Sequence, residues 1–164
     1  MTEVLQALYE YFRDDDGKDV KGNYLDDYQH ITYKALLGAT AANFHKHFVP
    51  SRQPQLLKDN VPVVAFYTVS MPPHNLAPIF NIITVEFDIY TDDPTLFTNT
   101  KIAQRHYQLL QEKIIPTPVT LPYLGKWHHQ TEMQLLLNNP NFFCYAQRFI
   151  VAVKREFSET KRKK

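Results

Sequence analysis

Histidine and carboxylate side chains are the groups in this chain whose types suit acid–base or metal chemistry. The chain has 164 residues, of which seven are histidines. His45 and His47 would point in different directions on a helix, and would chelate a metal together only on an extended segment. His128 and His129 are adjacent and would face opposite sides of a strand. Because there is no His-Glu-x-x-His pattern and no cysteine-rich ligand set, the sequence predicts no metal site.

The acidic residues form two further patterns. Glu86 and Asp88 would share one face of a strand, about 7 Å apart, and paired carboxylates at such a distance can perform acid–base chemistry. On an amphipathic strand we expect them instead to face solvent or a neighbouring subunit. The run Asp14–Asp19 is similar to a calcium loop in composition only. Its fifth and sixth residues are Lys18 and Asp19, where an EF-hand has a carboxylate and a glycine, so we expect a solvated acidic loop.

No nucleophile stands in a catalytic context. Ser51, Ser70 and Ser158 lack the surroundings of a nucleophile elbow. The four glycines of the chain are too scattered for a phosphate-binding loop, which needs several close together. Cys144, the one cysteine, lies in an aromatic, strand-like run, which favours a core thiol in a reducing compartment over a nucleophile. The sequence therefore predicts no catalytic residue and no cofactor, and we expect a protein that is not an enzyme.

Charge and composition limit the classes of partner that this protein is expected to bind. The formal net charge of +1 argues against a strongly electrostatic partner such as duplex DNA or an anionic membrane. Ten tyrosines, eleven phenylalanines and one tryptophan leave two alternatives open, an aromatic-rich core and an aromatic contact surface. There is no signal peptide pattern and no apolar run of about 20 residues, so we expect a soluble protein made in the cytoplasm. The basic tail of residues 155–164 is expected to stay solvated and disordered.

The elements that must position these residues follow from the hydrophobic pattern. Alternation over 82–91 predicts a strand that buries one face, with these residues toward the core: Ile83, Val85, Phe87 and Ile89. The opposite face would carry Thr84, Glu86, Asp88 and Tyr90. Asp93 and Pro94 then predict a helix cap and a first helical residue. The helix is expected over 96–115, with one side formed by Ile102, Ala103, His106, Leu109, Leu110 and Lys113.

The rest of the chain supplies the other elements. Helices are expected over 2–12 and 31–48, strands over 61–70 and 142–154, and either a strand or a partly helical segment over 124–136. The two strands flanking the proline-rich loop 71–78 are expected to form a hairpin. This order predicts an α+β fold, an antiparallel sheet with helices packed mainly on one face. We expect one domain over 1–154, with 1–30 as an N-terminal extension.

Several of these segments together resemble one known family. They are Val61–Val64, Ile83–Tyr90, the acidic turn and helix with Ala103, His106 and Leu109–Leu110, and Phe143–Phe149. Their order and residue types resemble the tail-terminator and tail-completion proteins of tailed bacteriophages. The resemblance covers about residues 36–154 in element order and is sharpest over about 61–110. The N-terminal extension and the segment Trp127–His129 have no counterpart in the family pattern.

The resemblance implies a structural virion protein without catalytic residues. Such a protein forms a homo-oligomeric ring, typically a hexamer, in the neck of the virion. The ring caps the tail tube protein and joins it to the head connector, while DNA only passes through its lumen. Glu86 and Asp88 would then be candidates to line that lumen. Candidate contacts with a neighbouring subunit or partner are in the hairpin loop and on aromatic residues: Pro72, Pro73, His74, Tyr28, Tyr33 and Trp127.

Two alternatives to a ring stay open at this point. One is a small metal-dependent nuclease or hydrolase, which would need His45, His47, His128 or His129 to converge with carboxylates in one pocket. The other is a monomeric adaptor that binds one protein partner without self-association.

Overall fold

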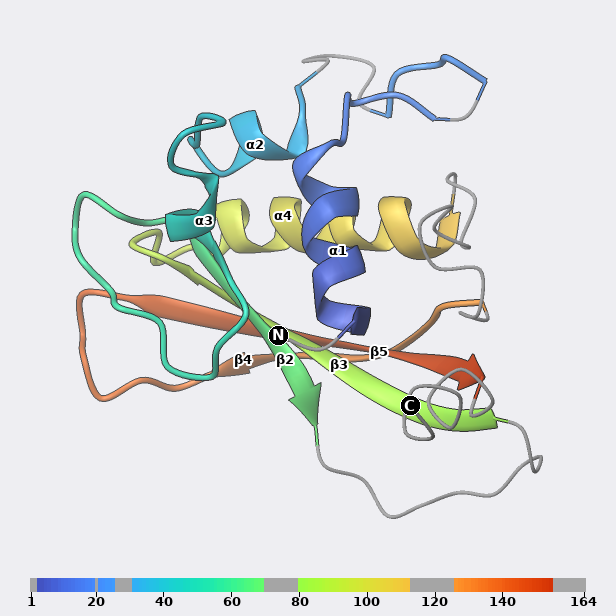
Figure 1. Cartoon of the computed structure of the whole chain (residues 1–164). Helices are drawn as coiled ribbons and strands as arrows, with labels where there is room; N and C mark the ends of the chain where they lie inside the picture. Colours follow the sequence, from blue (N-terminus) through green and yellow to red (C-terminus); the bar gives the residue numbers. More distant parts are fainter. Residues whose placement is uncertain (1–2, 20, 26–30, 70–79, 113–125, 155–164) are drawn as a thin grey trace.

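A five-stranded mixed sheet with helices on one face forms the fold (Figure 1). The structure is a computed structural model, and it describes residues 3–19, 21–25, 31–69, 80–112 and 126–154. The strand order across the sheet is β1-β2-β3-β5-β4. The strands are β1 (Phe48–Val49), β2 (Val63–Val69), β3 (Phe80–Thr91), β4 (His128–Leu135) and β5 (Phe143–Lys154). The α+β class predicted from the sequence is confirmed.

The long strands pair antiparallel, as expected. β3 is the central strand, and Phe87 lies between Phe66 of β2 and Gln147 of β5. The predicted hairpin of β2 and β3 is confirmed, although its loop lies outside the described residues. The two-residue strand β1 pairs parallel with β2, so the sheet is mixed and not wholly antiparallel. The ambiguous segment forms β4, with an irregularity between His129 and Thr131.

Helices and aromatic rings cover one face of the sheet. The helices are α1 (Glu3–Arg13), α2 (Tyr33–Leu36), α3 (Phe44–His47) and α4 (Phe97–Tyr107), which continues into the π-helical turn η1 (Gln108–Glu112). In Figure 1, α1 and α4 lie over the same face of the sheet. Phe48 stacks on Phe66 with ring centroids 4.1 Å apart, and Phe12 of α1 stacks on Phe87 at 5.7 Å. The aromatic residues thus build the core beneath the helices. In the described part of the chain, no helix is long and apolar enough to cross a membrane.

The single helix predicted over 31–48 is wrong. The structure has two one-turn helices there, α2 and α3, separated at Gly38, whose φ is 66°. The N–H of Ala39 donates to Lys34 O and that of Gly38 to Ala35 O, which is the Schellman arrangement that ends a helix at a left-handed residue. The glycine was the signal for this end, and the apolar spacing on both sides concealed it.

The predicted helix after β3 is confirmed, but it begins three residues later than the proline suggested. Asp93 accepts hydrogen bonds from the N–H of Thr95 at 2.9 Å and of Thr98 at 3.0 Å. Hydrogen bonds from Thr95 and Thr98 lower the pKa of Asp93 to about 2. The helical run starts only at Phe97, after Leu96 with a φ of 62°. The predicted apolar side of the helix is buried as expected: Ile102, Ala103, His106, Leu109 and Leu110. Lys113 lies outside the described residues.

Strand β3 is buried on both faces. Val85, Phe87 and Ile89 are inaccessible on the helix side, as the alternation predicted. The expectation of an open polar face opposite them is wrong, because the intervening residues are buried too: Thr84, Glu86, Asp88 and Tyr90. This second face is covered in part by residues 50–60, which we call the connector. Its Leu56 packs against Ala65, Tyr90 and Cys144.

We expect Asn99 to fix α4 to the sheet. Its amide donates to Ile89 O at 2.8 Å and to Phe143 O at 3.3 Å, and it accepts from Thr91. Asn99→Ala should lower the free energy of unfolding by about 2–3 kcal/mol in urea denaturation, because buried polar groups lose their partner. Gln104→Ala, an exposed change on the same helix, should change it by less than about 0.5 kcal/mol. Equal losses for both variants would contradict this role.

Candidate functional site

Several residues expected to form contact surfaces are in the core instead. Tyr33 and Trp127 each have 0% of their surface exposed, so the prediction that they form an open aromatic surface is wrong. Tyr33 packs edge-on against Phe12 and Phe48, and its ring fills the space under α1. An aromatic-rich core therefore accounts for these two residues. The other expected contact residues lie outside the described residues: Tyr28, Pro72, Pro73 and His74.

The histidines considered as metal ligands do not converge. His45 and His47 belong to α3, beside β1, while His128 and His129 belong to β4 at the opposite edge of the sheet. His47 is buried and its Nδ1 lies 2.8 Å from Pro62 O. His129 Nε2 lies 2.8 Å from a carboxylate oxygen of Glu132. Among residues 3–19, 21–25, 31–69, 80–112 and 126–154, no three His, Cys, Asp or Glu side chains are grouped to hold a metal.

The polar groups that do converge form what we call the carboxyl cluster: Tyr67, Glu86, Asp88 and Arg148. The sheet register places Glu86 directly between Tyr67 of β2 and Arg148 of β5, and Asp88 follows two residues later on the same face. Arg148 Nε donates to Glu86 Oε1 at 2.6 Å. The Tyr67 hydroxyl is in hydrogen-bond contact with Glu86 Oε2 and lies 2.6 Å from Asp88 Oδ2. Glu86 and Asp88 are only 5% and 3% exposed.

The cluster contains more acceptors than the tyrosine can satisfy. One hydroxyl carries one proton, so it cannot donate to two ionised carboxylates at once. Burial and the neighbouring Glu86 raise the pKa of Asp88 to about 7. Burial alone would raise the pKa of Glu86, but hydrogen bonds from Asp88, Tyr67 and Arg148 outweigh it and lower that pKa. The pKa values of the two acids are thus shifted in opposite directions. Glu86 is ionised beside Arg148, and Asp88 is neutral in mildly acidic solution.

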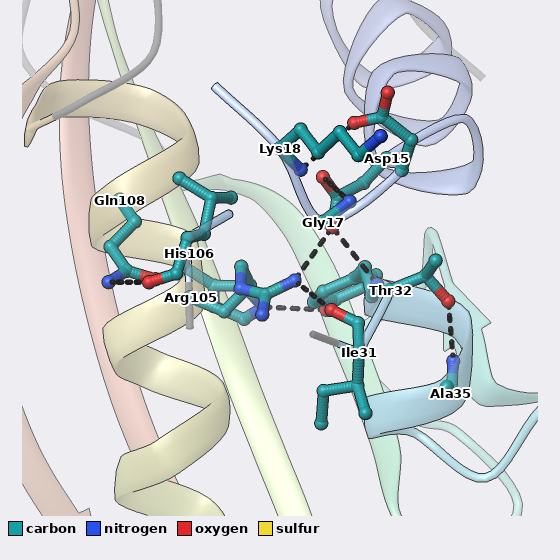
Figure 2. A network of polar contacts seen from close by, with 12 residues as sticks. Asp15, Gly17, Lys18, Ile31, Thr32, Ala35, Arg105, His106 and Gln108 are labelled. Carbon is teal, nitrogen blue, oxygen red and sulfur yellow. Dashed lines mark hydrogen bonds and ion pairs between the residues drawn. The ribbon is translucent and has the colours of Figure 1, made fainter. Parts of the chain in front are cut away.

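A second polar network lies on the helix side of the sheet and ties the N-terminal segment to α4 (Figure 2). Arg105 Nη1 lies 2.8 Å from Asp15 Oδ2 and donates to Ile31 O at 2.9 Å. The same Asp15 carboxylate accepts from the N–H groups of Gly17 and Tyr33. The Asp15 and Arg105 side chains are 2% and 4% exposed, so this is a buried ion pair whose remaining lone pairs are satisfied. The segment predicted as a solvated acidic loop therefore has one carboxylate in the interior.

His106 continues this network into the sheet. Its Nε2 lies 2.6 Å from the Tyr33 hydroxyl and its Nδ1 lies 3.0 Å from Gln147 Oε1. Gln147 Nε2 donates to Ala103 O and to Glu132. Burial lowers the pKa of His106 to about 3, so the ring is neutral at physiological pH. The Nδ1–H of the neutral ring donates a hydrogen bond to Gln147 Oε1, and the ring Nε2 accepts one from the Tyr33 hydroxyl. Both ring nitrogens are thus satisfied. This geometry holds α2, α4 and β5 together.

Tyr67, Arg148, Asp15 and Arg105 were not singled out from the sequence. Strand alternation could have placed Tyr67 and Arg148 on one face of their own strands, but only the register of β2 and β5 brings them opposite Glu86. No local signal marks the pairing of Asp15 with Arg105, which are far apart in the chain and meet only through the packing of α4. The carboxyl cluster can hold or release one proton near neutral pH, and this is the chemistry that the site supports.

Comparison with protein-family models found no family that matches this chain, and comparison with curated proteins found no similar protein.

The buried ion pair gives a prediction for stability. Arg105→Met should lower the free energy of unfolding by about 3–5 kcal/mol, because it leaves the Asp15 carboxylate buried without its cation. The matched change Arg13→Met removes an exposed pair with Asp14 and should cost less than about 1 kcal/mol. Urea denaturation of the two variants measures the difference. Similar costs for both would mean that Asp15 is not held as a buried anion.

The carboxyl cluster gives a prediction for pH dependence. A pKa raised from 3.8 to about 7 means that the neutral Asp88 contributes stability that is fully present below about pH 4 and is lost as the pH rises through about 7. The free energy of unfolding of the wild type relative to Asp88→Asn should fall across that window by on the order of 1.4 kcal/mol per pH unit. Denaturation of both proteins at a series of pH values measures this difference.

Asp93→Asn is the matched control for this titration. Because the pKa of Asp93 is lowered from 3.8 to about 2, its contribution to stability is present above about pH 3.8 and is lost only as the pH falls through about 2. The difference between wild type and Asp93→Asn should therefore be flat between about pH 5 and 8. A flat profile for Asp88→Asn in the same range would show that Asp88 has an ordinary pKa.

Proposed function

We propose that this chain is a structural subunit of a homo-oligomeric ring in the neck of a tailed bacteriophage, of the tail-terminator or tail-completion type. The ring, expected to be a hexamer, would cap the tail tube and join it to the head connector. Its place would be the virion, with assembly in the host cytoplasm. In this proposal DNA only passes through the lumen, and the chain needs no cofactor and catalyses no reaction.

The observation that carries the proposal is the arrangement of the segments on which the resemblance rests. The β2–β3 hairpin, helix α4 and the closing strand β5 are parts of one unit. β5 pairs with β3 over twelve residues, from Phe80 opposite Lys154 to Thr91 opposite Phe143. Asn99 and His106 join α4 to the same two strands, directly or through Gln147. A sheet held in this way is a rigid scaffold, which suits a subunit that acts by contact alone.

Exposed apolar side chains offer contacts for a ring. A ring uses a heterologous interface, in which one patch meets a different patch on the next subunit. Met133 and Leu136 lie in and after the edge strand β4, and are 58% and 91% exposed. Leu57, in the connector between β1 and β2, is 52% exposed. These residues replace Tyr33 and Trp127 as our candidates for subunit contacts. Glu86 and Asp88 are buried in the single chain, so the proposal assigns them no part in DNA passage.

The test is the mass of the purified protein by light scattering over a concentration series, with negative-stain imaging. We expect rings, or a monomer that becomes a ring when tail tubes are added. Met133→Glu combined with Leu136→Glu should abolish ring formation, because it places charges in an apolar contact. Gln130→Glu combined with Gln134→Glu, which adds the same charge at exposed positions of the same strand, should leave the ring intact.

The same experiment separates the alternatives. A protein that stays monomeric at tens of micromolar and does not bind tail tubes would contradict the proposal. A monomer that binds one tail component would support the adaptor alternative. Stoichiometric metal in the purified protein, lost in His129→Ala, would support a metal-dependent nuclease or hydrolase.

A further inference from the structure

The second face of the sheet, opposite the helices, has a small apolar cluster beside the carboxyl cluster. Ala65, Tyr90 and Cys144 form it, and Leu56 of the connector packs against it together with Leu135 and Leu137 from the end of β4 and beyond. A second connector residue reaches the carboxyl cluster, because the Arg52 guanidinium lies 4.8 Å from the centre of the Tyr67 ring. Arg52 Nη2 also donates to Thr68 O at 3.2 Å. An apolar contact of Leu56 and the contacts of Arg52 therefore attach the connector to this face.

We propose that the carboxyl cluster is a proton-binding site that keeps the connector closed over this face, so that loss of one proton from Asp88 loosens the connector and makes the face accessible. This proposal does not rest on the proposed ring.

The contacts within the cluster determine how many protons it must hold. Tyr67 lies between two carboxyl groups and carries one hydroxyl proton, so a second proton is needed for both contacts to be favourable. Glu86 accepts from Arg148 and is the group best placed to stay ionised. Asp88 Oδ1 has no hydrogen-bond partner among the described residues. A buried carboxylate with a bare oxygen is costly, whereas a neutral carboxyl group in that place costs far less. The second proton therefore belongs to Asp88.

The charged and titratable groups that face Asp88 act in opposite directions. Burial and the neighbouring Glu86 on β3 disfavour a negative charge on Asp88, whereas the hydrogen bond from Tyr67 on β2 favours one. Tyr90 on β3 and Cys144 on β5 also lie nearby, and burial raises the pKa of both, so they stay neutral and supply no charge. The cations Arg148 on β5 and Arg52 on the connector favour a negative charge on Asp88, but Arg148 is already paired with Glu86. Burial is the largest influence and raises the pKa of Asp88 to about 7, in agreement with the proton count.

Release of the proton leaves a buried negative charge on Asp88, which the sheet cannot move toward water. Asp88 is paired between Ala65 of β2 and Ala146 of β5, so its backbone is fixed on both sides. The new carboxylate must gain water instead. The connector is held on this face by contacts of Arg52 and Leu56 and is not part of the sheet. Its movement admits water and exposes Cys144 on the side that Leu56 covers, while Leu135 and Leu137 stay packed against the cluster. Cys144 is fully buried when the connector is closed.

Cys144 provides a direct readout, because it is the one cysteine of the chain. Its reaction with a dithiodipyridine reagent, divided by that of glutathione at the same pH, measures how often the face opens. For an opening linked to one proton, this normalised rate should rise by up to about tenfold per pH unit between about pH 5 and 7 and level off above that. In Asp88→Asn the normalised rate should be independent of pH.

Two further variants separate the connector from the rest of the protein. Arg52→Ala removes one anchor and should raise the normalised rate at every pH while keeping the pH profile. Lys58→Ala changes an exposed residue of the same connector and should leave both the normalised rate and its pH profile unchanged. Labelling in low urea completes the test, because a local opening exposes little surface and should depend only weakly on urea.

Several results would overturn the proposal. These are a normalised rate that does not change with pH in the wild type, an Asp88→Asn protein that keeps the wild-type profile, or a rate that follows global unfolding in urea. Should Asp88→Asn fail to fold, Tyr67→Phe is the second variant. It removes the shared hydroxyl without adding a charge, and it should shift the midpoint of the profile. An unshifted midpoint would equally contradict the proposal.

Discussion

Strand β3 is buried on both faces, and the helices, the neighbouring strands and the connector are all arranged around it. β3 is hydrogen-bonded to β2 on one side and to β5 on the other, so it has no free edge to adjust. Its apolar residues lie on the helix side, and its polar residues lie on the face that the connector covers in part. A strand in this position needs a partner for every polar group, because a buried group without one costs about 1–3 kcal/mol. The two sides of the strand meet this demand in different ways.

On the helix side, the polar groups are neutral or fully paired. His106 is held uncharged between Tyr33 and Gln147, and the buried Arg105 is matched by Asp15. On the other side, two carboxyl groups share one tyrosine and one arginine, and the count of protons decides whether the arrangement is satisfied. The contacts on the helix side are therefore satisfied without a shared proton, whereas those on the connector side depend on one.

The sequence predicted the parts of the fold that follow from periodicity. The alternation in 82–91 identified β3 and its core face, and the spacing of Ile102, Ala103 and His106 identified the buried side of α4. The sequence-based prediction of burial failed where the pattern on one face of an element gave no information about what covers its other face. The polar residues of β3 are characteristic of an open face, and only the connector, placed by Leu56 and Arg52, shows that they are covered. Tyr33 was expected among exposed aromatic contacts, because its own residue type does not distinguish a core ring from a contact ring. In the structure it is fully buried and packs against Phe12 and Phe48.

The carboxyl cluster could be assembled from the sequence only in part. Glu86 and Asp88 were recognised as a pair on one strand face, but their partners come from two other strands whose register no local pattern sets. Their neutralisation by a shared proton depends on that register and on burial. The contact residues of the proposed ring could not be predicted from the sequence either. Two of the aromatic residues expected there, Tyr33 and Trp127, lie in the core, and only the folded chain shows that Leu57, Met133 and Leu136 are exposed.

Titration of the Asp88 carboxyl carbon by ¹³C NMR in the wild-type protein would show whether the cluster holds a shared proton. We expect its chemical shift to change with a midpoint near pH 7, while Glu86 stays ionised through the same range. A midpoint for Asp88 near 3.8, the ordinary value for an aspartate, would contradict the account. It would mean that the cluster holds two carboxylates and no shared proton.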